Sequence, residues 1–376
     1  MVRPGAHLIF NHSSWPRFRW EAATLTEELA ALAEEERLLA NKLNYIDNIF
    51  YDELHRISLF DETVSTLELD DEFVDSSDLK DTLSNKNISF DNNLEKVTNK
   101  SSDNCGLYNN SLEKFIDLYL DVRLNPKKEL TKNRFFIWAR SLARPGSLAG
   151  LGPLRSETFG SDPLFPGPAP FSLVLCPAPA PNRLQGEIDR FLNWFNSPMT
   201  CDAVIKGAVA HLWLLILRPF VVGTGRLARA VGDLVRTSNN ETGLYLSLSK
   251  VINQNRPLYF RKFREALTAQ DLDITPWLNW YIKMSAEAAQ EAGQRVDIII
   301  NQAIYWAKAR KYPLNTRQKN VLSLLLADFI GLLTAERYAE ITRCDNLIAE
   351  KEFNQLIYYN LIERRFLAPT APGRSL

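Results

Sequence analysis

The sequence predicts a mainly α-helical protein with more than one domain. Apolar residues recur at helical spacing in several stretches, most continuously from Asn182 to Lys308. Nine of the 19 prolines fall between Arg144 and Pro181, which leaves the helical stretches almost free of helix-breaking residues. A length of 376 residues exceeds what one hydrophobic core usually supports, so we expect two or three domains.

The N-terminal elements follow from spacing and composition. An aromatic cluster over Trp15–Trp20 precedes a leucine stripe that predicts a helix over Leu25–Leu43, with the glutamates mostly off the stripe. The chain is acidic over Asp61–Asp81. Asparagine and serine dominate residues 84–110, which predicts a flexible surface loop, and helical spacing resumes near Ser111.

The remaining elements are a proline-rich segment and a series of helices. The prolines between residues 144 and 181 exclude a long helix and leave one short extended piece at Phe171–Cys176. Apolar stripes beginning at Leu184, Ile205 and Leu227 then predict three helices, and Trp277–Lys308 supplies more. After Pro313, three short stripes have the spacing of a small helix-turn-helix domain. The expected segments are 1–83, 84–110, 111–308 and 309–376.

Composition excludes several functional classes. With 44 Lys and Arg against 45 Asp and Glu, the net charge of −1 argues against a protein coated with basic residues for sequence-independent nucleic-acid binding. The four cysteines lie far apart without a CxxC motif, which argues against a disulfide framework or a zinc module. The most apolar stretch, Ala208–Val222, contains His211, Arg218 and Pro219 and is too short to span a bilayer. Without a signal peptide, we expect a cytoplasmic protein.

The stretch from Ala210 to Arg229 carries the chemistry. An apolar helix should end at Arg218, since Pro219 disfavours helix at the residue before it, and a new helix should begin near Arg226. Glycines 223 and 225 between them allow backbone N–H groups to converge on an anion at a helix N-terminus. Arg226 and Arg229, three residues apart, share one face and could clamp a phosphate. A plain tight turn with solvent-facing arginines is the competing interpretation.

This stretch resembles the signature of the Fic (Fido) family, His-Pro-Phe-x-x-Asp/Glu-Gly-Asn-Gly-Arg-x-x-Arg. The matching residues are Pro219, Phe220, Gly223, Gly225, Arg226 and Arg229. Further stretches resemble the family in the same order along the chain, namely Trp15–Trp20, Arg190–Asn196, Ala210–Trp213 and, for a C-terminal winged-helix unit, Leu314–Gln318, Leu333–Thr334 and Pro372–Ser375. The resemblance implies a helical Fido-type core with a short β-hairpin flap, an N-terminal helical segment and a C-terminal winged-helix domain.

The resemblance implies a protein adenylyltransferase, in which the motif His is the general base for AMP transfer from ATP to a Ser, Thr or Tyr hydroxyl of a target protein. This chain has Arg218 at the position of that His, and a guanidinium stays protonated and cannot accept a proton. Val222 stands at the position that holds Mg²⁺, which argues against a metal, and Thr224 replaces the motif Asn. We therefore expect a pocket at Gly223–Arg229 that binds ATP or another phosphate but transfers AMP weakly or not at all. His211 lies about 10 Å from Arg218 along the helix and is expected to be a packed residue.

Many family members are restrained by a helix whose Glu pairs with the second motif arginine, Arg229 in this chain. Counting back from Leu69–Ser77 places Ser65 where that Glu belongs and Thr66 where a Gly belongs. Glu62 and Glu68 are each three positions away and reach Arg229 only in another register. An exposed acidic helix is the alternative.

Three functions remain open from the sequence. The chain is an active nucleotidyltransferase, a non-catalytic nucleotide- or phosphate-binding protein, or a regulator that acts through its winged helix. The candidate recognition helix of that unit, Asn346–Leu356, carries Glu350 and Glu352 against Lys351, which argues against a DNA contact. The flap is expected at Ser172–Pro177.

Overall fold

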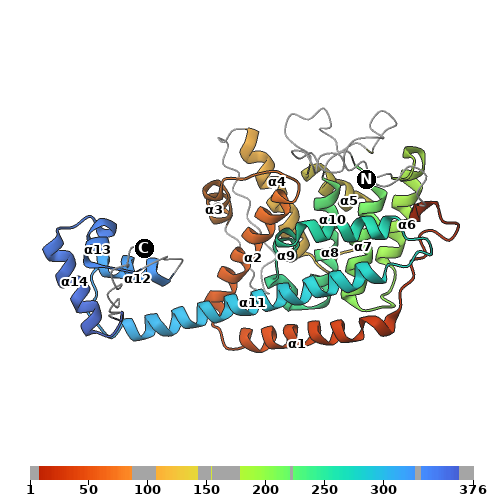
Figure 1. Ribbon diagram of the computed structural model, residues 1–376. Coiled ribbons are helices and arrows are strands. Elements are labelled where there is room, and N and C mark those ends of the chain that lie inside the picture. Colours follow the sequence, from red (N-terminus) through yellow and green to blue (C-terminus); the bar gives the residue numbers. More distant parts are fainter. Residues whose placement is uncertain are drawn as a thin grey trace, which may run out of the picture. The chain divides into compact units, whose positions relative to one another are not determined.

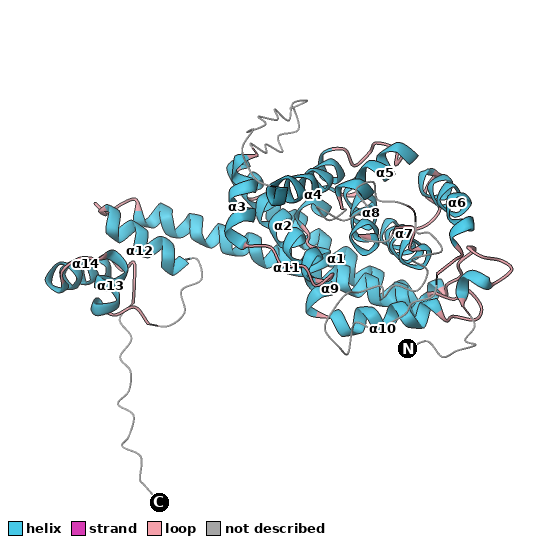
Figure 2. Cartoon of the chain, turned by 90° about the horizontal axis from the view of Figure 1, so that it is seen from above, coloured by secondary structure: helices cyan, strands magenta, loops and turns pink. Residues whose placement is uncertain are grey.

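The computed structural model describes residues 8–86, 107–142, 154, 178–220, 223–326 and 332–363. The chain forms two compact units, Met1–Val296 and Asp297–Leu376, and the long helix α11 (Thr275–Ala309) runs through the division between them. Figure 1 shows the helices in chain order, and Figure 2 shows that the described elements are helices and loops.

The N-terminal segment of the first unit is anchored by aromatic side chains. After the short 3-10 helices η1 (Ile9–Asn11) and η2 (Ala22–Leu25) come α1 (Thr26–Leu43), α2 (Asn48–Glu68) and α3 (Ser76–Asn85). Trp15 is buried, its ring meets those of Phe18 and Trp213 edge-on, and its Nε1 donates a hydrogen bond of 3.1 Å to Glu187. This contact joins the first residues of the chain to helices that follow more than 160 residues later.

The centre of the first unit is the pair α7 (Ala203–Leu217) and α8 (Thr224–Asn239), which make the most extensive contact between two helices. α7 is buried on every side, because its sequence is apolar all round. Two glycines allow the close approach: a Cβ on Gly232 would lie 2.8 Å from Tyr281 Oη, and one on Gly207 would lie 3.3 Å from the carbonyl oxygen of Gly232.

Other helices surround this pair. α4 (Leu107–Leu124) and α5 (Lys132–Ser141) contact α8, and α6 (Leu184–Asn196), which follows η4 (Pro181–Arg183), contacts α7. The 3-10 helix η5 (Glu241–Tyr245) leads from α8 to α9 (Leu248–Gln254), which packs on α2, and then to α10 (Arg256–Leu267). Two of these helices begin with a capping side chain, Thr131 before α5 and Asp202 before α7.

The second unit contains the end of α11 and the helices α12 (Thr316–Leu326), α13 (Ala335–Thr342) and α14 (Asn346–Tyr358). Its core gathers the three stripes that the sequence singled out, with Val321, Tyr338 and Leu356 fully buried. In the residues described for this unit no strand is assigned, so the winged-helix prediction stays a prediction.

The mainly α fold is confirmed, and most helix positions agree with the spacing of apolar residues. α7 ends at Leu217, one residue before the predicted end, and α8 begins at Thr224, two residues before the predicted start. The expected flap at Ser172–Pro177 and most of the loop 84–110 lie outside the described residues. Across the parts of the chain that the structure describes, no helix has the length and apolar character needed to cross a membrane.

Two buried histidines predict how stability depends on pH. Burial, with the nearby charge of Arg123, lowers the pKa of His55 to about 3. Burial, with the charge of Arg229, lowers the pKa of His211 well below its ordinary value. Between pH 6.5 and pH 3 the unfolded chain therefore binds protons that the folded chain does not, and stability falls as pH falls.

We expect His55→Phe to remove one of these two contributions, about 1.4 kcal/mol per pH unit below pH 6. The phenyl ring keeps the stacking on Tyr245, whose centroid lies 4.5 Å from that of His55. Urea unfolding of both proteins at pH 6.5, 5.5 and 4.5 measures the difference. Equal slopes for the two proteins contradict the prediction.

Candidate functional site

The candidate site is the turn between α7 and α8, where both flanking residues adopt left-handed backbone. Arg218 caps α7 with φ of 44° and ψ of 59°, and its N–H donates to the carbonyl oxygen of Leu214 at 3.0 Å. Gly223 precedes α8 with φ of 80°. The chain thus reverses within a few residues, and the first N–H groups of α8, which have no partner within a helix, open toward the turn.

Helix α5 shapes this turn from one side. Phe220 is buried, and its ring centroid lies 5.7 Å from that of Phe135 and 5.8 Å from that of Phe136. A Cβ on Gly223 would lie 2.9 Å from Cβ of Leu142, which follows α5 directly. The hydroxyl of Thr224 donates a hydrogen bond of 3.1 Å to the carbonyl oxygen of Phe220. Glycine is therefore required at position 223 by both its backbone conformation and its surroundings.

Arg226 and Arg229 project from α8 toward the end of α2, where one carboxylate joins them. Asp70 lies 2.8 Å from Nε of Arg226 and 3.1 Å from Nη2 of Arg229. Glu72 accepts two hydrogen bonds from Arg226, each 3.1 Å, in the bidentate geometry that suits a guanidinium. Thr66 accepts from Arg229 with its hydroxyl and, at 2.9 Å, with its carbonyl oxygen. We call these three residues, Asp70, Glu72 and Thr66, the clamp.

The clamp neutralises charges that water does not reach. The side chains of Arg226 and Arg229 are 5% and 2% exposed, and that of Asp70 is 14% exposed. Burial is the largest influence on the pKa of Arg229 and lowers it, but Asp70 together with Tyr259 and Tyr119 outweighs burial, so the pKa of Arg229 stands above its ordinary value. Nη1 of Arg229 is buried and makes no hydrogen bond to the residues that the structure describes. This nitrogen lies close to Gly225, where an added Cβ would be 3.1 Å from it.

The two glutamates considered from the sequence do not reach these arginines. Glu62 is buried and accepts hydrogen bonds from Ser247 and from the N–H of Ser249, at the start of α9. Glu68 accepts from the side-chain amide of Asn253 at 2.7 Å. The alternative of an exposed acidic helix is wrong as well, because Thr66 and Glu62 are 0% and 1% exposed. Thr66, at the position counted for the family's Gly, is the residue of α2 that contacts Arg229.

His211 is a packed residue, as the sequence predicted. It is fully buried, and its Nε2 lies 3.1 Å from the hydroxyl of Tyr259. The rings of Trp277 and Tyr281 meet it edge-on. It therefore belongs to the aromatic core between α7, α10 and α11.

The residue at the position of the family's acidic metal-binding residue is Val222, which lies outside the described residues. Within the described ranges no group of three His, Cys, Asp or Glu side chains is arranged to hold a metal ion. The predicted site residues lie at the end of α7 and the start of α8, and all of them except Gly223 are buried: Arg218, Gly223, Thr224, Gly225, Arg226 and Arg229.

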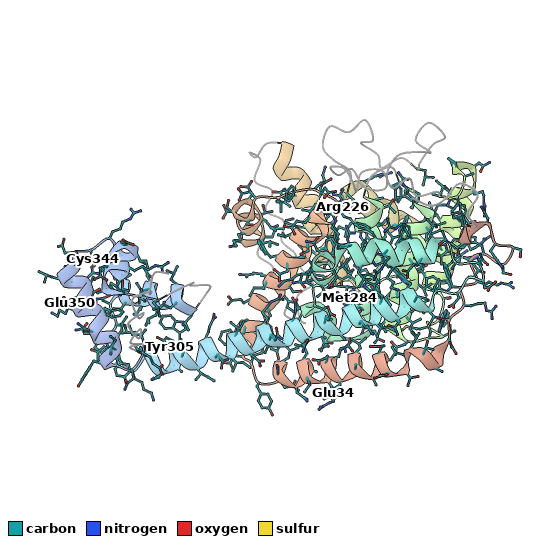
Figure 3. The ribbon with its side chains drawn as sticks, in the orientation of Figure 1. Glu34, Arg226, Met284, Tyr305, Cys344 and Glu350 are labelled. Atoms are coloured by element: carbon teal, nitrogen blue, oxygen red, sulfur yellow. The ribbon has the colours of Figure 1, made fainter. Side chains whose placement is uncertain are left out.

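Sequence reasoning missed the clamp. Asp70 and Glu72 belong to the acidic stretch over Asp61–Asp81, in which the sequence singled out only Glu62 and Glu68 as possible partners of Arg229, and they lie more than 150 residues before their partners. The sequence signal that could have revealed the clamp is the presence of both an acidic stretch and a pair of arginines in one chain. Figure 3 labels Arg226 among the side chains of the first unit.

The conformation of Gly223 predicts a large effect of a small substitution. Gly223→Ala should destabilise the protein by about 2 kcal/mol or more, because alanine is strained in left-handed backbone and its Cβ would overlap with Leu142. Gly186→Ala is the matched control, since a Cβ there meets nothing within 4 Å, and helix α6 should gain up to about 1 kcal/mol. Thermal unfolding measures both variants. A Gly223→Ala protein as stable as Gly186→Ala contradicts the prediction.

Comparison with known proteins is informative over different parts of the chain. Residues 8–86 match the model of a family described as a domain of unknown function, DUF4172. The curated proteins named Protein adenylyltransferase Fic from Drosophila melanogaster and Drosophila simulans are 25% identical over 194 residues, which is 47% of this chain and 37% of theirs. The matched region therefore spans little more than a third of those relatives.

Two solved structures share the fold. A Fic family protein from Desulfovibrio desulfuricans has a TM-score of 0.54 at 14% identity, over 89% of this chain and 90% of that one. A Fic domain containing signaling protein from Bacteroides thetaiotaomicron has a TM-score of 0.53 at 12% identity, over 72% of this chain and 98% of that one. These matches show that the chain shares the fold of the two Fic proteins.

Proposed function

We propose that this chain is an adenylyltransferase-like Fic protein whose turn at Gly223–Arg229 takes the phosphates of ATP, and which transfers AMP weakly or not at all. The observation that carries the proposal is the pair Arg226 and Arg229, retained at the motif positions but engaged by Asp70 and Glu72. The proposed acceptors of any transferred AMP are Ser, Thr or Tyr hydroxyls of target proteins.

The geometry fits a phosphate only when the carboxylates move. A phosphate oxygen and a carboxylate oxygen seek the same N–H donors of a guanidinium, so Asp70 and Glu72 occupy the directions that an anion would use. Nη1 of Arg229 and the first N–H groups of α8 are further donors near Gly225. ATP binding therefore requires that the segment after α2 withdraw from α8.

The base position supports weak transfer. The side chain of Arg218 is buried, and its guanidinium remains a cation at physiological pH. It provides a donor at the place where a general base must accept a proton. Loss of a general base costs on the order of 10² to 10⁴ in rate. The positively charged guanidinium of Arg218 is better suited to holding an anion than to activating a hydroxyl.

Release of the clamp is the first test. We expect Asp70→Asn to strengthen ATP binding at least about tenfold in calorimetric titration, since the competing carboxylate charge is lost, and to lower stability by about 2–3 kcal/mol. Asp71→Asn is the matched control, because Asp71 is the neighbouring carboxylate and pairs with Arg256 instead. Arg229→Ala in the Asp70→Asn background should abolish the gain. Unchanged ATP affinity in Asp70→Asn contradicts the proposal.

Catalytic competence is the second test. With α-labelled ATP, Mg²⁺ and a cell lysate, we expect the wild-type chain to label protein at least about 100-fold less than the variant Arg218→His/Val222→Asp/Thr224→Asn, because the variant restores the base. Both proteins are also compared in the Asp70→Asn background, where the clamp no longer competes. Wild-type labelling as strong as that of the triple variant refutes weak transfer.

A further inference from the structure

The second unit separates its charges along the chain. From Ile298 to Leu326 there is no carboxylate, whereas the whole chain is balanced. The basic residues of this stretch all have exposed side chains and lie around the end of α11 and the start of α12, at Lys308, Arg310, Lys311, Arg317 and Lys319. A local basic surface is therefore present in a protein whose total charge is nearly zero.

Most of these cations are not neutralised within the unit. In the residues described from 297 to 363, Arg310, Lys311 and Lys319 form no ion pair. Lys308 donates to the carbonyl oxygen of Asn360 at 2.6 Å, a contact that leaves its charge uncompensated. Arg317 differs, since it pairs with Glu352. The exposed charge around the end of α11 is thus free to attract an anion.

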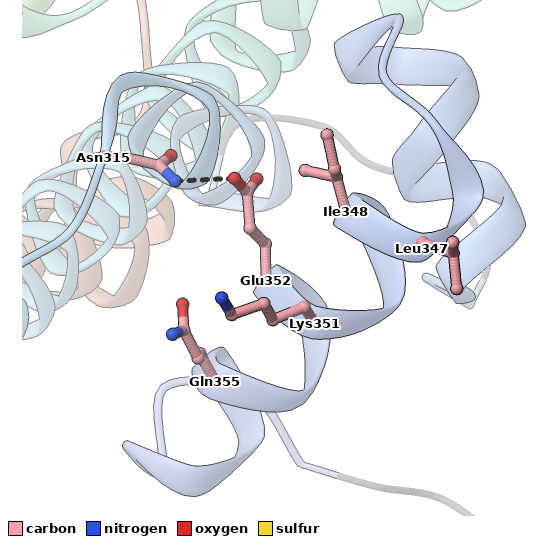
Figure 4. A pocket seen from close by; sticks show the side chains of 6 residues that line it. All are labelled: Asn315, Leu347, Ile348, Lys351, Glu352 and Gln355. Atoms are coloured by element: carbon pink, nitrogen blue, oxygen red, sulfur yellow. Dashed lines mark hydrogen bonds between the residues drawn. The ribbon is translucent and has the colours of Figure 1, made fainter.

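The structure also removes an acid that argued against such a partner. Glu352 is 6% exposed and accepts hydrogen bonds from Arg317, from the hydroxyl of Tyr338 at 2.8 Å and from Asn315 at 2.8 Å. The hydrogen bond from Arg317 is the largest cause that keeps the pKa of Glu352 below its ordinary value. Figure 4 shows its carboxylate directed at Asn315. The exposed charges of α14 are then Glu350 and Lys351, which cancel.

Aromatic rings lie beside the cations at the end of α11. Tyr312, which follows Lys311, stacks on Tyr359 with a centroid distance of 4.5 Å and an interplanar angle of 16°. The ring of Tyr358 lies 5.9 Å from that of Tyr359 and is 83% exposed. Tyr305 of α11, labelled in Figure 3, donates to the carbonyl oxygen of Leu361 at 2.7 Å and helps to hold the end of α14 in place.

We propose that the surface formed by Lys308, Arg310, Lys311 and Tyr358 binds single-stranded nucleic acid. Cations contact the phosphates, and the exposed face of Tyr358 stacks on a base. An exposed ring with a polar tip beside several cations is typical of single-strand binding surfaces. Duplex DNA is a poorer match, because the exposed charges of the candidate recognition helix α14 cancel. Glu363, which is close to Tyr358 in sequence, is an exposed carboxylate, and the three cations of the proposed surface outnumber it.

Fluorescence anisotropy with the full chain tests the proposal, using labelled 20-nucleotide strands of oligo-dT and oligo-U. We expect both strands to bind at 50 mM salt, with a slope of log K against log salt of about −2, as three phosphate contacts predict. Comparable affinity for the two strands indicates recognition of backbone and bases in general, and a preference for oligo-U indicates RNA. No binding of either strand at 50 mM salt overturns the proposal.

Variants then locate the surface. Arg310→Glu/Lys311→Glu should weaken binding at least about tenfold and flatten the salt slope. Arg56→Glu/Arg261→Glu changes the net charge equally on exposed residues of the first unit and should weaken binding less than about twofold. Tyr358→Ala should weaken binding about fivefold or more, and Tyr358→Phe should keep it. Thermal unfolding verifies that each variant is folded, and Arg310→Gln/Lys311→Gln repeats the test with a smaller change.

Three further results overturn the proposal. Equal losses in the two charge-reversed proteins show nonspecific attraction. A duplex competitor that displaces the labelled strand better than an unlabelled single strand shows a duplex-binding surface. Tighter binding to phosphatidylserine vesicles than to either strand, lost in Arg310→Glu/Lys311→Glu, shows a membrane surface, for which exposed Ile298 and Ile304 on α11 would be the apolar part.

Discussion

The position of Asp70 between Arg226 and Arg229 is the constraint on which the first unit depends. The guanidinium groups of Arg226 and Arg229 are both buried, and buried charges of one sign are stable only with compensating partners. Asp70 supplies that compensation for both at once, while Thr66 and Glu72 satisfy further donors. The carboxylate therefore holds the end of α2 against α8. The N-terminal segment and the motif turn are parts of one electrostatic arrangement.

This arrangement links structure to the proposed function. In the proposed function, Gly223, Gly225 and the two arginines form an anion-binding turn, and Asp70 and Glu72 pair with the arginines that an anion would use. The same principle acts in the second unit with a different outcome. Glu352 is compensated inside by Arg317, so the cations around the end of α11 meet solvent without a carboxylate partner among the described residues. In both units, the placement of carboxylates decides which cations remain available to a ligand.

Much of the fold could be predicted, because the sequence pattern of a helix is formed by residues only three or four positions apart. The apolar stripes of α1, α6, α7 and α8 repeat every three to four residues, and Pro219 and Gly223 mark where α7 ends and α8 begins. The motif residues were also recognisable, since their spacing is short. The clamp was not, because Asp70 and Arg229 lie 159 residues apart and an acidic stretch alone is most simply a solvated face. Nor does a sequence reveal that Arg218 adopts left-handed backbone.

The sequence by itself determined the helical class, the family resemblance and the presence of Arg218 where the motif has a histidine, because each depends on residue identity and near-neighbour spacing. Only the tertiary structure decided which charges are compensated. Glu62 and Glu68 turn toward α9, Asp70 and Glu72 reach α8, and Glu352 is withdrawn from the surface of α14. The reason is physical: the availability of a charge depends on its burial and on partners distant in sequence, and both arise when helices pack.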